Sequence, residues 1–255
     1  MNYIISAVTD IGIKKSTNQD SLSLKIINTP QGKMVFGILC DGMGGLEKGE
    51  VASTTVINSF NQWVYKQLPL LCNKPIEDAI IRKQWENIVI SMNDKIKIYG
   101  ASQGIQLGTT VVAILLTENR YYILNVGDSR IYELSENIRQ LTKDQTFIQR
   151  EIDLGNLTPE QAELDSRKNV LLQCVGASDE VYPDMYFGLT KKDAVYMLCS
   201  DGFRHVINAE EIYNGLNPDV MLSEESMKRN VTSLIELNKR RQETDNISVA
   251  VIRTF

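Results

Sequence analysis

The order of the predicted elements constrains the fold of this chain most strongly. Short β-type runs come first, at Tyr3-Thr9, Ser21-Ile27 and Lys33-Cys40, and two long helical stretches follow, at about Gly49-Leu71 and Ile76-Tyr99. Strands then resume in a group, whereas a parallel βαβ sheet would alternate strands with single helices. We therefore expect two antiparallel sheets with helices covering their outer faces.

The second half of the chain continues this pattern and closes with a helix and a strand. The predicted strands are Thr109-Leu116, Tyr121-Val126, Arg130-Leu134, Val170-Val175, Tyr182-Leu189, Ala194-Cys199 and Asn246-Ile252. The predicted helices are Gln145-Leu154, one that starts at Thr158-Pro159, and Glu224-Arg240. Thr158 can cap its helix, and Pro159 fits the first helical position. No internal repeat or long linker divides the sequence, so we expect one domain over residues 1-255.

The charge balance argues against a nucleic-acid binder. The chain carries 27 Lys and Arg against 32 Asp and Glu, a formal net charge of -5, whereas affinity for a phosphate backbone comes from clustered basic residues. The dense basic run Lys239-Arg240-Arg241 fits the last turn of a helix, where the helix dipole favours cations. No apolar stretch reaches the roughly 18 residues that a membrane helix needs. We expect no nucleic-acid or membrane partner, and a monomer.

The four cysteines indicate a reducing compartment. Cys40, Cys174 and Cys199 lie in apolar runs, and none of the four, Cys72 included, belongs to a C-x-x-C pair. This spacing does not suggest zinc. Reduced thiols in apolar runs are typical of the core of an intracellular protein, so we expect a cytoplasmic location.

Five short acidic segments carry the candidate chemistry, because each places an aspartate beside an apolar strand. They are Asn18-Gln19-Asp20, Cys40-Asp41-Gly42-Met43-Gly44-Gly45, Val126-Gly127-Asp128-Ser129-Arg130, Cys199-Ser200-Asp201-Gly202-Phe203 and Thr244-Asp245-Asn246. Strand ends are where a rigid scaffold presents functional side chains. Mg²⁺ and Mn²⁺ bind carboxylate, carbonyl and water oxygens, which these segments supply.

Each segment taken alone also has a structural interpretation. Asp-Gly after an apolar run is a common turn, because glycine accepts positive φ and aspartate caps its own backbone. Asp128 alone fits an ordinary loop position. We expect His205, the single histidine, to be a surface or packing residue and not a ligand.

The complete set, in this order, resembles the metal-dependent protein phosphatases of the protein phosphatase 2C family. The similar motifs are Asp41-Gly42-Met43-Gly44-Gly45 with Gly49-Glu50-Val51-Ala52-Ser53, Gly108-Thr109-Thr110, Val126-Gly127-Asp128-Ser129-Arg130, Leu141-Thr142-Lys143-Asp144, Leu198-Cys199-Ser200-Asp201-Gly202 and Asp245-Asn246. The Asp-Gly-Met-Gly-Gly wording and the insert after Asp144 resemble the bacterial branch. The resemblance implies an α+β fold, a four-layer α-β-β-α sandwich with a metal cleft at one end of the two sheets.

The resemblance also implies the metal ligands. Asp41 would bridge two divalent cations, Mn²⁺ or Mg²⁺, and the carbonyl of Gly42 would bind one of them. Asp201 and Asp245 would complete the other site. Asp128, together with Asp201, would hold a weaker third ion.

The activity implied is hydrolysis of phosphoserine and phosphothreonine in proteins that a serine/threonine kinase has phosphorylated. Two metals roughly 3.5–4 Å apart bridge a water, make hydroxide near neutral pH and clamp the phosphate for in-line attack. No covalent phospho-enzyme is needed. Mammalian-type members have a candidate acid, histidine, where Met43 stands, so here water must protonate the leaving oxygen.

Other residues would support the site, and two of them depart from the family pattern. Asp20 would orient water beside the metals, and Asn246 would fix the loop that carries Asp245. Lys15 aligns with an arginine that grips the substrate phosphate, and lysine lacks the planar fork of arginine. Gln19 stands where glutamate is usual, which removes a negative charge.

Two alternatives to an active protein phosphatase remain open from the sequence. Lys15 and Gln19 would suit a pseudo-enzyme that acts as a binding module, although the retained aspartates argue against it. A metal-dependent hydrolase of another phosphate ester would share the same residues. The polar insert at about Leu141-Asn169 resembles the mobile flap beside the cleft in bacterial members, and we expect it to open more easily than the core.

Overall fold

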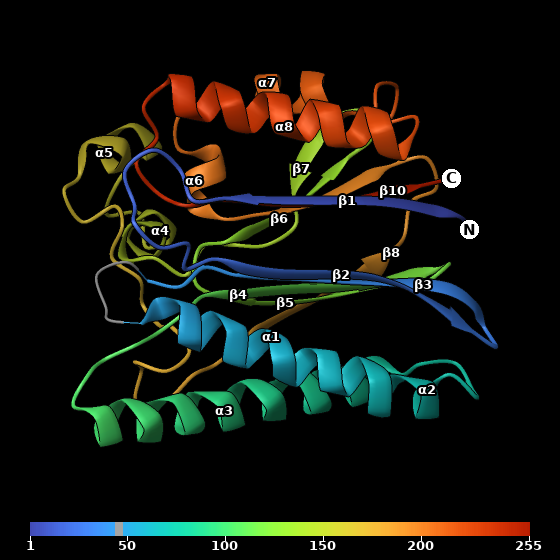
Figure 1. Cartoon of the computed structure of the whole chain (residues 1–255), viewed down its shortest axis with the longest axis horizontal. Helices are drawn as coiled ribbons and strands as arrows, with labels where there is room; N and C mark the ends of the chain where they lie inside the picture. Colours follow the sequence, from blue (N-terminus) through green and yellow to red (C-terminus); the bar gives the residue numbers. More distant parts are fainter. Residues whose placement is uncertain (44–47) are drawn as a thin grey trace.

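Two five-stranded antiparallel sheets form the centre of the molecule (Figure 1). The computed structural model describes residues 1–43 and 48–255. The first sheet has the order β1 (Tyr3–Asp10), β10 (Ile247–Thr254), β9 (Val195–Cys199), β6 (Arg130–Leu134) and β7 (Ile138–Gln140). The second has the order β2 (Ser21–Thr29), β3 (Gly32–Cys40), β4 (Val111–Leu116), β5 (Arg120–Val126) and β8 (Asp184–Leu189).

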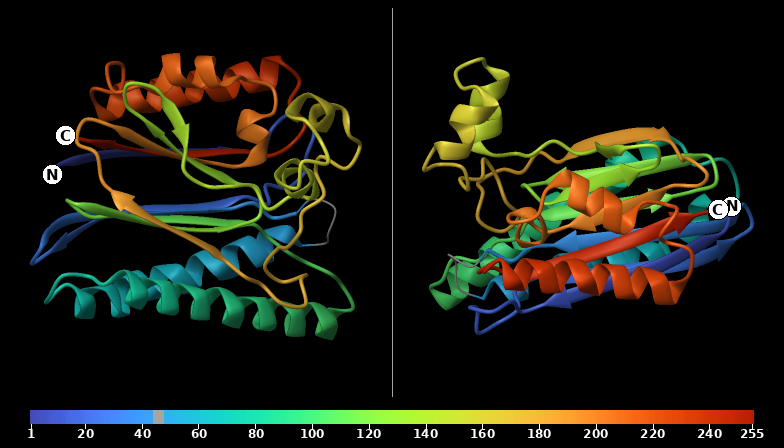
Figure 2. Two further views of the ribbon diagram at one scale, coloured as in Figure 1. Left: turned by 180° about the vertical axis from the view of Figure 1, so that it is seen from behind. Right: turned by 90° about the horizontal axis from the view of Figure 1, so that it is seen from above.

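Helices cover the outer faces of both sheets. The helices on the second sheet are α1 (Gly49–Lys66), α2 (Leu68–Leu71) and α3 (Asp78–Gln103), and those on the first are α6 (Asp201–Arg204), α7 (Ala209–Leu216) and α8 (Glu224–Arg240). Two further helices, α4 (Phe147–Asp153) and α5 (Pro159–Leu164), project from one end of the sandwich (Figure 2). The predicted α-β-β-α sandwich is confirmed.

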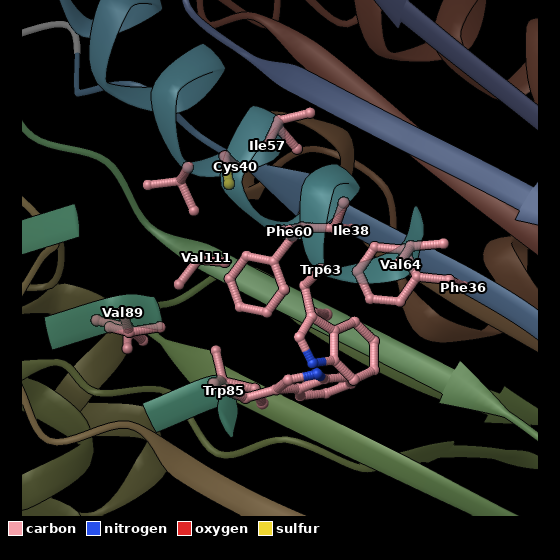
Figure 3. Close-up of a cluster of buried hydrophobic side chains, with 14 of the residues drawn as sticks. Phe36, Ile38, Cys40, Ile57, Phe60, Trp63, Val64, Trp85, Val89 and Val111 are labelled. Carbon is pink, nitrogen blue, oxygen red and sulfur yellow. The ribbon is translucent and has the colours of Figure 1, made fainter. Parts of the chain in front are cut away.

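The central strands are apolar on both faces because each face meets a different core. In β3, Phe36 packs with α1 and α3, whereas its neighbour Val35 points between the two sheets. On the helical side, an aromatic cluster forms in which Phe36 and Trp85 each contact the rings of Phe60 and Trp63 and of one another, with centroids 5.5 to 6.1 Å apart (Figure 3). Continuous apolar runs, not alternating ones, are what a layer buried on both sides requires.

The antiparallel register gathers the acidic segments at one end of the sandwich. Ser21 pairs with Cys40 in the second sheet, and Cys199 pairs with both Arg130 and Val249 in the first. All five acidic segments flank these paired strand ends. At the opposite end of β1 and β10, the first and last strands bring the two chain termini side by side (Figure 1).

Two predicted elements, and the start of the predicted insert, differ in the structure. The first long helix is broken at Gln67, where α1 stops and the short α2 begins, with Pro69 at its start. The predicted strand Val170-Val175 is wrong. Only isolated bridges form there, at Leu171 and Val175, because their partners Thr146 and Thr109 lie outside strands and no ladder can extend.

The predicted insert also begins too early. Leu141 and Thr142 are buried beside β6 and exchange hydrogen bonds with the backbone of Ile131, and Gln145 is buried beneath the turn at Gly127. The projecting part therefore starts at about Phe147. All four cysteines are free and buried, which was predicted for Cys40, Cys174 and Cys199 but not for Cys72. Among the described helices, none is long and apolar enough to cross a membrane.

Candidate active site

A cavity of about 560 Å³ lies at the end of the sandwich where the acidic segments meet. Asp41, Asp128, Asp201 and Asp245 all line it, and residues of the 169–178 segment close one side. Four aspartates predicted from separate parts of the sequence are therefore brought together. Gly44 and Gly45 of the predicted motif lie outside the described residues.

Asp41 is held through its backbone by the strand beside it. Its amide donates to the hydroxyl of Thr110 (3.1 Å), and its carbonyl accepts from the Thr110 amide (2.9 Å) and the Thr109 hydroxyl (2.9 Å). The next residue, Gly42, packs against the backbone of Gly49 so closely that any side chain there would collide with it. These contacts leave the Asp41 carboxylate free to face the cavity.

Two glycines hold the Asp245–Asn246 backbone between them. A Cβ at Gly12 would strike the Asp245 carbonyl and one at Gly202 the Asn246 carbonyl, and Gly12 also has φ +78°. Asn246 is 3% exposed, and its side chain accepts from the Gln19 backbone amide (2.9 Å) and donates to the carbonyl of Ile11 (2.9 Å). Asn246 thus ties the start of β10 to the N-terminal loop.

Lys15 lies among the carboxylates. Its Nζ is 2.8 Å from Oδ1 of Asp245, and the lysine side chain is 29% exposed. Burial would lower the pKa of Lys15, but the bond to Asp245 and the charges of Asp41 and Asp201 raise it overall. An ammonium whose pKa is raised by its neighbours therefore stands within the acidic site.

Helix α6 and the residue after it place three functional groups beside the cavity, of which Asp201 lines it. Asp201 begins the helix, and Arg204 donates to the Asp128 carbonyl (2.9 Å) with its Nη2 3.6 Å from the Asp128 carboxylate. His205 lies 3.3 Å from Asp201 and 3.4 Å from Glu243. The His205 ring, whose side chain is 33% exposed, bridges two carboxylates beside the cavity, a contact that the sequence did not predict.

Burial and the charges of neighbouring groups shift the pKa values of the acidic residues in the site. Burial raises the pKa of Asp20 to about 7 and that of Asp128 to about 7, and the charge of Asp201 acts in the same direction on both. Burial, followed by the charges of Asp20 and Asp201, raises the pKa of Asp41 well above its usual range. Asp201 is different: burial opposes its ionisation, but His205 and then Arg204 hold its pKa below the usual range. His205 in turn has its pKa raised to about 10 by Asp201 and Glu243, against the effect of burial.

The donor set fits hard divalent cations. Both carboxylate oxygens of Asp20 and Oδ1 of Asp201 are buried and have no hydrogen-bond partner among the described residues. Carboxyl groups with raised pKa values lack compensating positive charge, which a cation would supply. Within residues 1–43 and 48–255, no three histidine, cysteine or acidic side chains stand as a ready ligand set. Asp245 is paired with Lys15, and Asp201 with His205, instead.

Known proteins are similar to this chain in sequence and in fold. Residues 13–234 match the family described as Protein phosphatase 2C. The chain belongs to the protein phosphatase 2C family. Membership makes it a metal-dependent serine/threonine protein phosphatase, as the sequence predicted.

Bacterial relatives of this phosphatase match nearly its whole length. The protein phosphatase PhpP of Streptococcus pneumoniae is 29% identical over 251 residues, which are 97% of this chain and 96% of PhpP. The serine/threonine protein phosphatase PstP of Mycobacterium tuberculosis is 32% identical over 250 residues, 96% of this chain and 44% of PstP. The structure of the S. agalactiae serine/threonine phosphatase has a TM-score of 0.84 at 28% identity, with 100% of both chains covered. The PstP catalytic domain in complex with 2 manganese ions has a TM-score of 0.76 at 29% identity, covering 98% of this chain and 97% of that one.

Sequence reasoning missed three side chains that contact the predicted site residues of this phosphatase. Arg204 and His205 follow Asp201 at spacings of three and four, which places them near it on a helix, so the spacing itself was a usable signal. Glu243 lies two residues before Asp245, and its contact with His205 is visible only in the fold.

Proposed function

We propose that this phosphatase hydrolyses phosphoserine and phosphothreonine in proteins with a pair of Mn²⁺ or Mg²⁺ ions at the cavity, without a covalent intermediate. The convergence of Asp41, Asp128, Asp201 and Asp245 on one cavity is the observation that supports this most. Oxygen donors from four separate strand ends give a rigid, negatively charged site. The manganese complex of the related PstP domain is consistent with it.

Each aspartate has a distinct proposed role. Asp41, which the Thr110 backbone and hydroxyl fix in place, would contribute to both ions, with the Gly42 carbonyl on one of them. Asp201 and Asp245 would complete the second ion's ligands. Asp128 would contribute to a weaker third ion. When bound, the cations supply activation of water at neutral pH and neutralisation of the phosphate oxygens.

The remaining groups act around the metals. Asp20, with both oxygens buried and unpartnered among the described residues, would accept hydrogen bonds from water in the site. Asn246 holds the N-terminal loop against β10 and so keeps Lys15 at the cavity edge. The Met43 thioether lines the cavity but cannot donate a proton, so the leaving oxygen takes its proton from water.

Two assays separate this function from its alternatives. Hydrolysis of p-nitrophenyl phosphate that depends on added Mn²⁺ would exclude a pseudo-enzyme. Hydrolysis of phosphoserine and phosphothreonine peptides, at rates above those for non-protein phosphate esters, would exclude a phosphatase for other metabolites. A protein that hydrolyses neither substrate with Mn²⁺ or Mg²⁺ would contradict the proposal.

Lys15 should contribute to phosphate binding, since its ammonium lies in the site. We expect Lys15→Arg to lower KM for a phosphopeptide, because a guanidinium can make two parallel bonds to phosphate, and Lys15→Ala to raise KM. Steady-state kinetics at saturating Mn²⁺ measures both effects. The neighbouring Lys14, which is exposed, gives the matched control Lys14→Ala. If both Lys15 variants have the same KM and kcat as the wild type, Lys15 does not contact the substrate phosphate.

The projecting segment, residues 147–169, should influence protein substrates more than small ones. It buries few side chains, and Leu154 and Leu164 are 65% and 89% exposed, so we expect its amides to exchange faster than those of β3 and β4. Replacing it with the corresponding PhpP segment should change selectivity among phosphoproteins, with a smaller change in p-nitrophenyl phosphate hydrolysis. Equal damage to both activities, or exchange as slow as in the core strands, would show that the segment is structural.

A further inference from the structure

Two of the proposed ligands of one metal ion are connected through side chains that are not ligands themselves. Asp201 begins α6, and Asp245 lies in the loop before β10. Direct packing between these segments occurs at Gly202, which meets the Asn246 backbone. His205 and Glu243 add a second, polar connection, and it runs close to both carboxylates.

The His205 ring stands between two acidic groups. Its Nε2 is 3.3 Å from Oδ2 of Asp201, and its Nδ1 is 3.4 Å from Oε2 of Glu243. Each ring nitrogen therefore has one carboxylate oxygen within ion-pair distance. Because Oδ2 of Asp201 faces the ring, Oδ1 is the oxygen that remains without a partner in the described part of the chain.

Glu243 carries the connection from His205 to the Asp245 backbone. Its carboxylate is buried, with 5% of the side chain exposed. While Oε2 faces His205, Oε1 accepts hydrogen bonds from the amides of Thr244 (2.7 Å) and Asp245 (2.9 Å). A continuous series of contacts therefore runs from the Asp201 carboxylate, through an imidazole and a second carboxylate, to the amide of Asp245.

We propose that His205 and Glu243 form a strut that fixes Asp201 relative to the Asp245 loop and so sets the affinity for the metal ion that these two aspartates share. The inference rests on the proposed function. Both strut residues are positioning residues, because they act through the aspartates and do not bind the ion. Without the strut, the partly buried carboxylates of Asp201 and Asp245, which carry like charge, would have to be held together by the rest of the fold when the ion is absent.

Metal affinity, measured apart from catalysis, tests the strut. His205→Phe keeps a ring of similar size but removes both nitrogens, and Glu243→Ala removes the acceptor for the loop amides. Calorimetric titration of the metal-stripped proteins with Mn²⁺ should show a roughly 10- to 100-fold weaker Kd in each, the range seen when residues that orient metal ligands are removed. The double variant should bind Mn²⁺ with about the same Kd as the single variant of lower affinity, because either substitution breaks the same series of contacts.

Catalysis at saturating Mn²⁺ distinguishes positioning from a direct role. We expect kcat for p-nitrophenyl phosphate to stay close to that of the wild type once the site is filled. Glu243→Gln keeps an oxygen for the Thr244 and Asp245 amides but removes the charge that faces His205. It should therefore weaken Mn²⁺ binding less than Glu243→Ala does. If Glu243→Ala fails to fold, Glu243→Gln takes its place in the titration.

A nearby ion pair provides the matched control. Arg241, just after α8, is bound by Glu211 of α7 at 2.8 Å, which links neighbouring elements without touching the aspartates. Glu211→Gln removes this charge while retaining a residue suited to the helix cap that Glu211 forms with Asn208. It should leave the Mn²⁺ affinity unchanged.

Three results would overturn the strut. They are an unchanged Mn²⁺ affinity in His205→Phe, an equal loss of affinity in Glu211→Gln, and a fall in kcat at saturating Mn²⁺ with unchanged affinity, which would make His205 a catalytic residue. Failure of the proposed function is a separate outcome. In that case the wild-type protein itself would neither bind Mn²⁺ nor hydrolyse the aryl phosphate.

Discussion

Asp41→Asn should abolish turnover while the protein remains folded. Asp41 is the carboxylate proposed to contribute to both ions, and its backbone contacts with Thr109 and Thr110 do not depend on the side-chain charge. The pKa of Asp41 is raised by burial and by neighbouring acidic groups, so the ionised form destabilises the metal-free fold. The metal-free variant should accordingly have a Tm at or above that of the wild type.

Activity and thermal unfolding at saturating Mn²⁺ measure this prediction. The wild-type Tm should rise with Mn²⁺, since ligands that bind only the folded state stabilise it, and the variant should lose most of that rise. Asp94→Asn, at an exposed position of α3, should behave as the wild type in both assays. If Asp41→Asn retains more than about a tenth of the wild-type rate, a loss below ~1.4 kcal/mol in the barrier, Asp41 does not bridge the metals.

Trp85→Ala should cause a large loss of stability without touching the active site. The side chain is fully buried and contacts the rings of Phe36, Phe60 and Trp63, so its removal leaves a cavity between the second sheet and its helices. Truncation of buried tryptophan to alanine costs about 3–5 kcal/mol. Urea unfolding followed by circular dichroism measures the free energy of unfolding.

Tyr65→Ala is the control for this substitution. Tyr65 lies on α1, and 68% of the residue is exposed, so its truncation should change the free energy of unfolding by less than about 1 kcal/mol. A loss of under about 1 kcal/mol in Trp85→Ala would mean that the neighbouring rings collapse into the vacated space. The aromatic cluster would then be less rigid than its packing indicates.

The strands and long helices could be predicted because their signals are local. β3 and β4 are short apolar runs bounded by polar residues, and α3 repeats apolar residues at helical spacing. The missed elements β7, α6 and α7 are three, four and eight residues long, and the first two are too short for a periodic pattern. α7 did carry a start signal, since Asn208 and Glu211 form a capping box. Val170-Val175 misled the prediction because an apolar run says nothing about whether a partner strand is available.

The site could be predicted in part for the same reason. Asp41, Asp201 and Asp245 adjoin strands, so their positions followed once the strands were assigned. The pairing of Lys15 with Asp245 and the link from His205 to Glu243 join segments distant in sequence. Such contacts depend on how the loops fold against one another, which no spacing within the sequence expresses.

The paired termini have a consequence for how this fold can be joined to further sequence. Tyr3 faces Thr254 at one end of β1 and β10, whereas Asp10 faces Ile247 at the other end, two residues after Asp245 of the acidic cavity. Additional sequence can therefore be joined at either terminus without crossing the substrate's approach. The matched part of PstP is only 44% of that protein, so at least one relative combines this fold with a long further stretch of chain. Because both termini lie together at the end opposite the cavity, a linker joined to either of them would leave the cavity facing away from the attachment point.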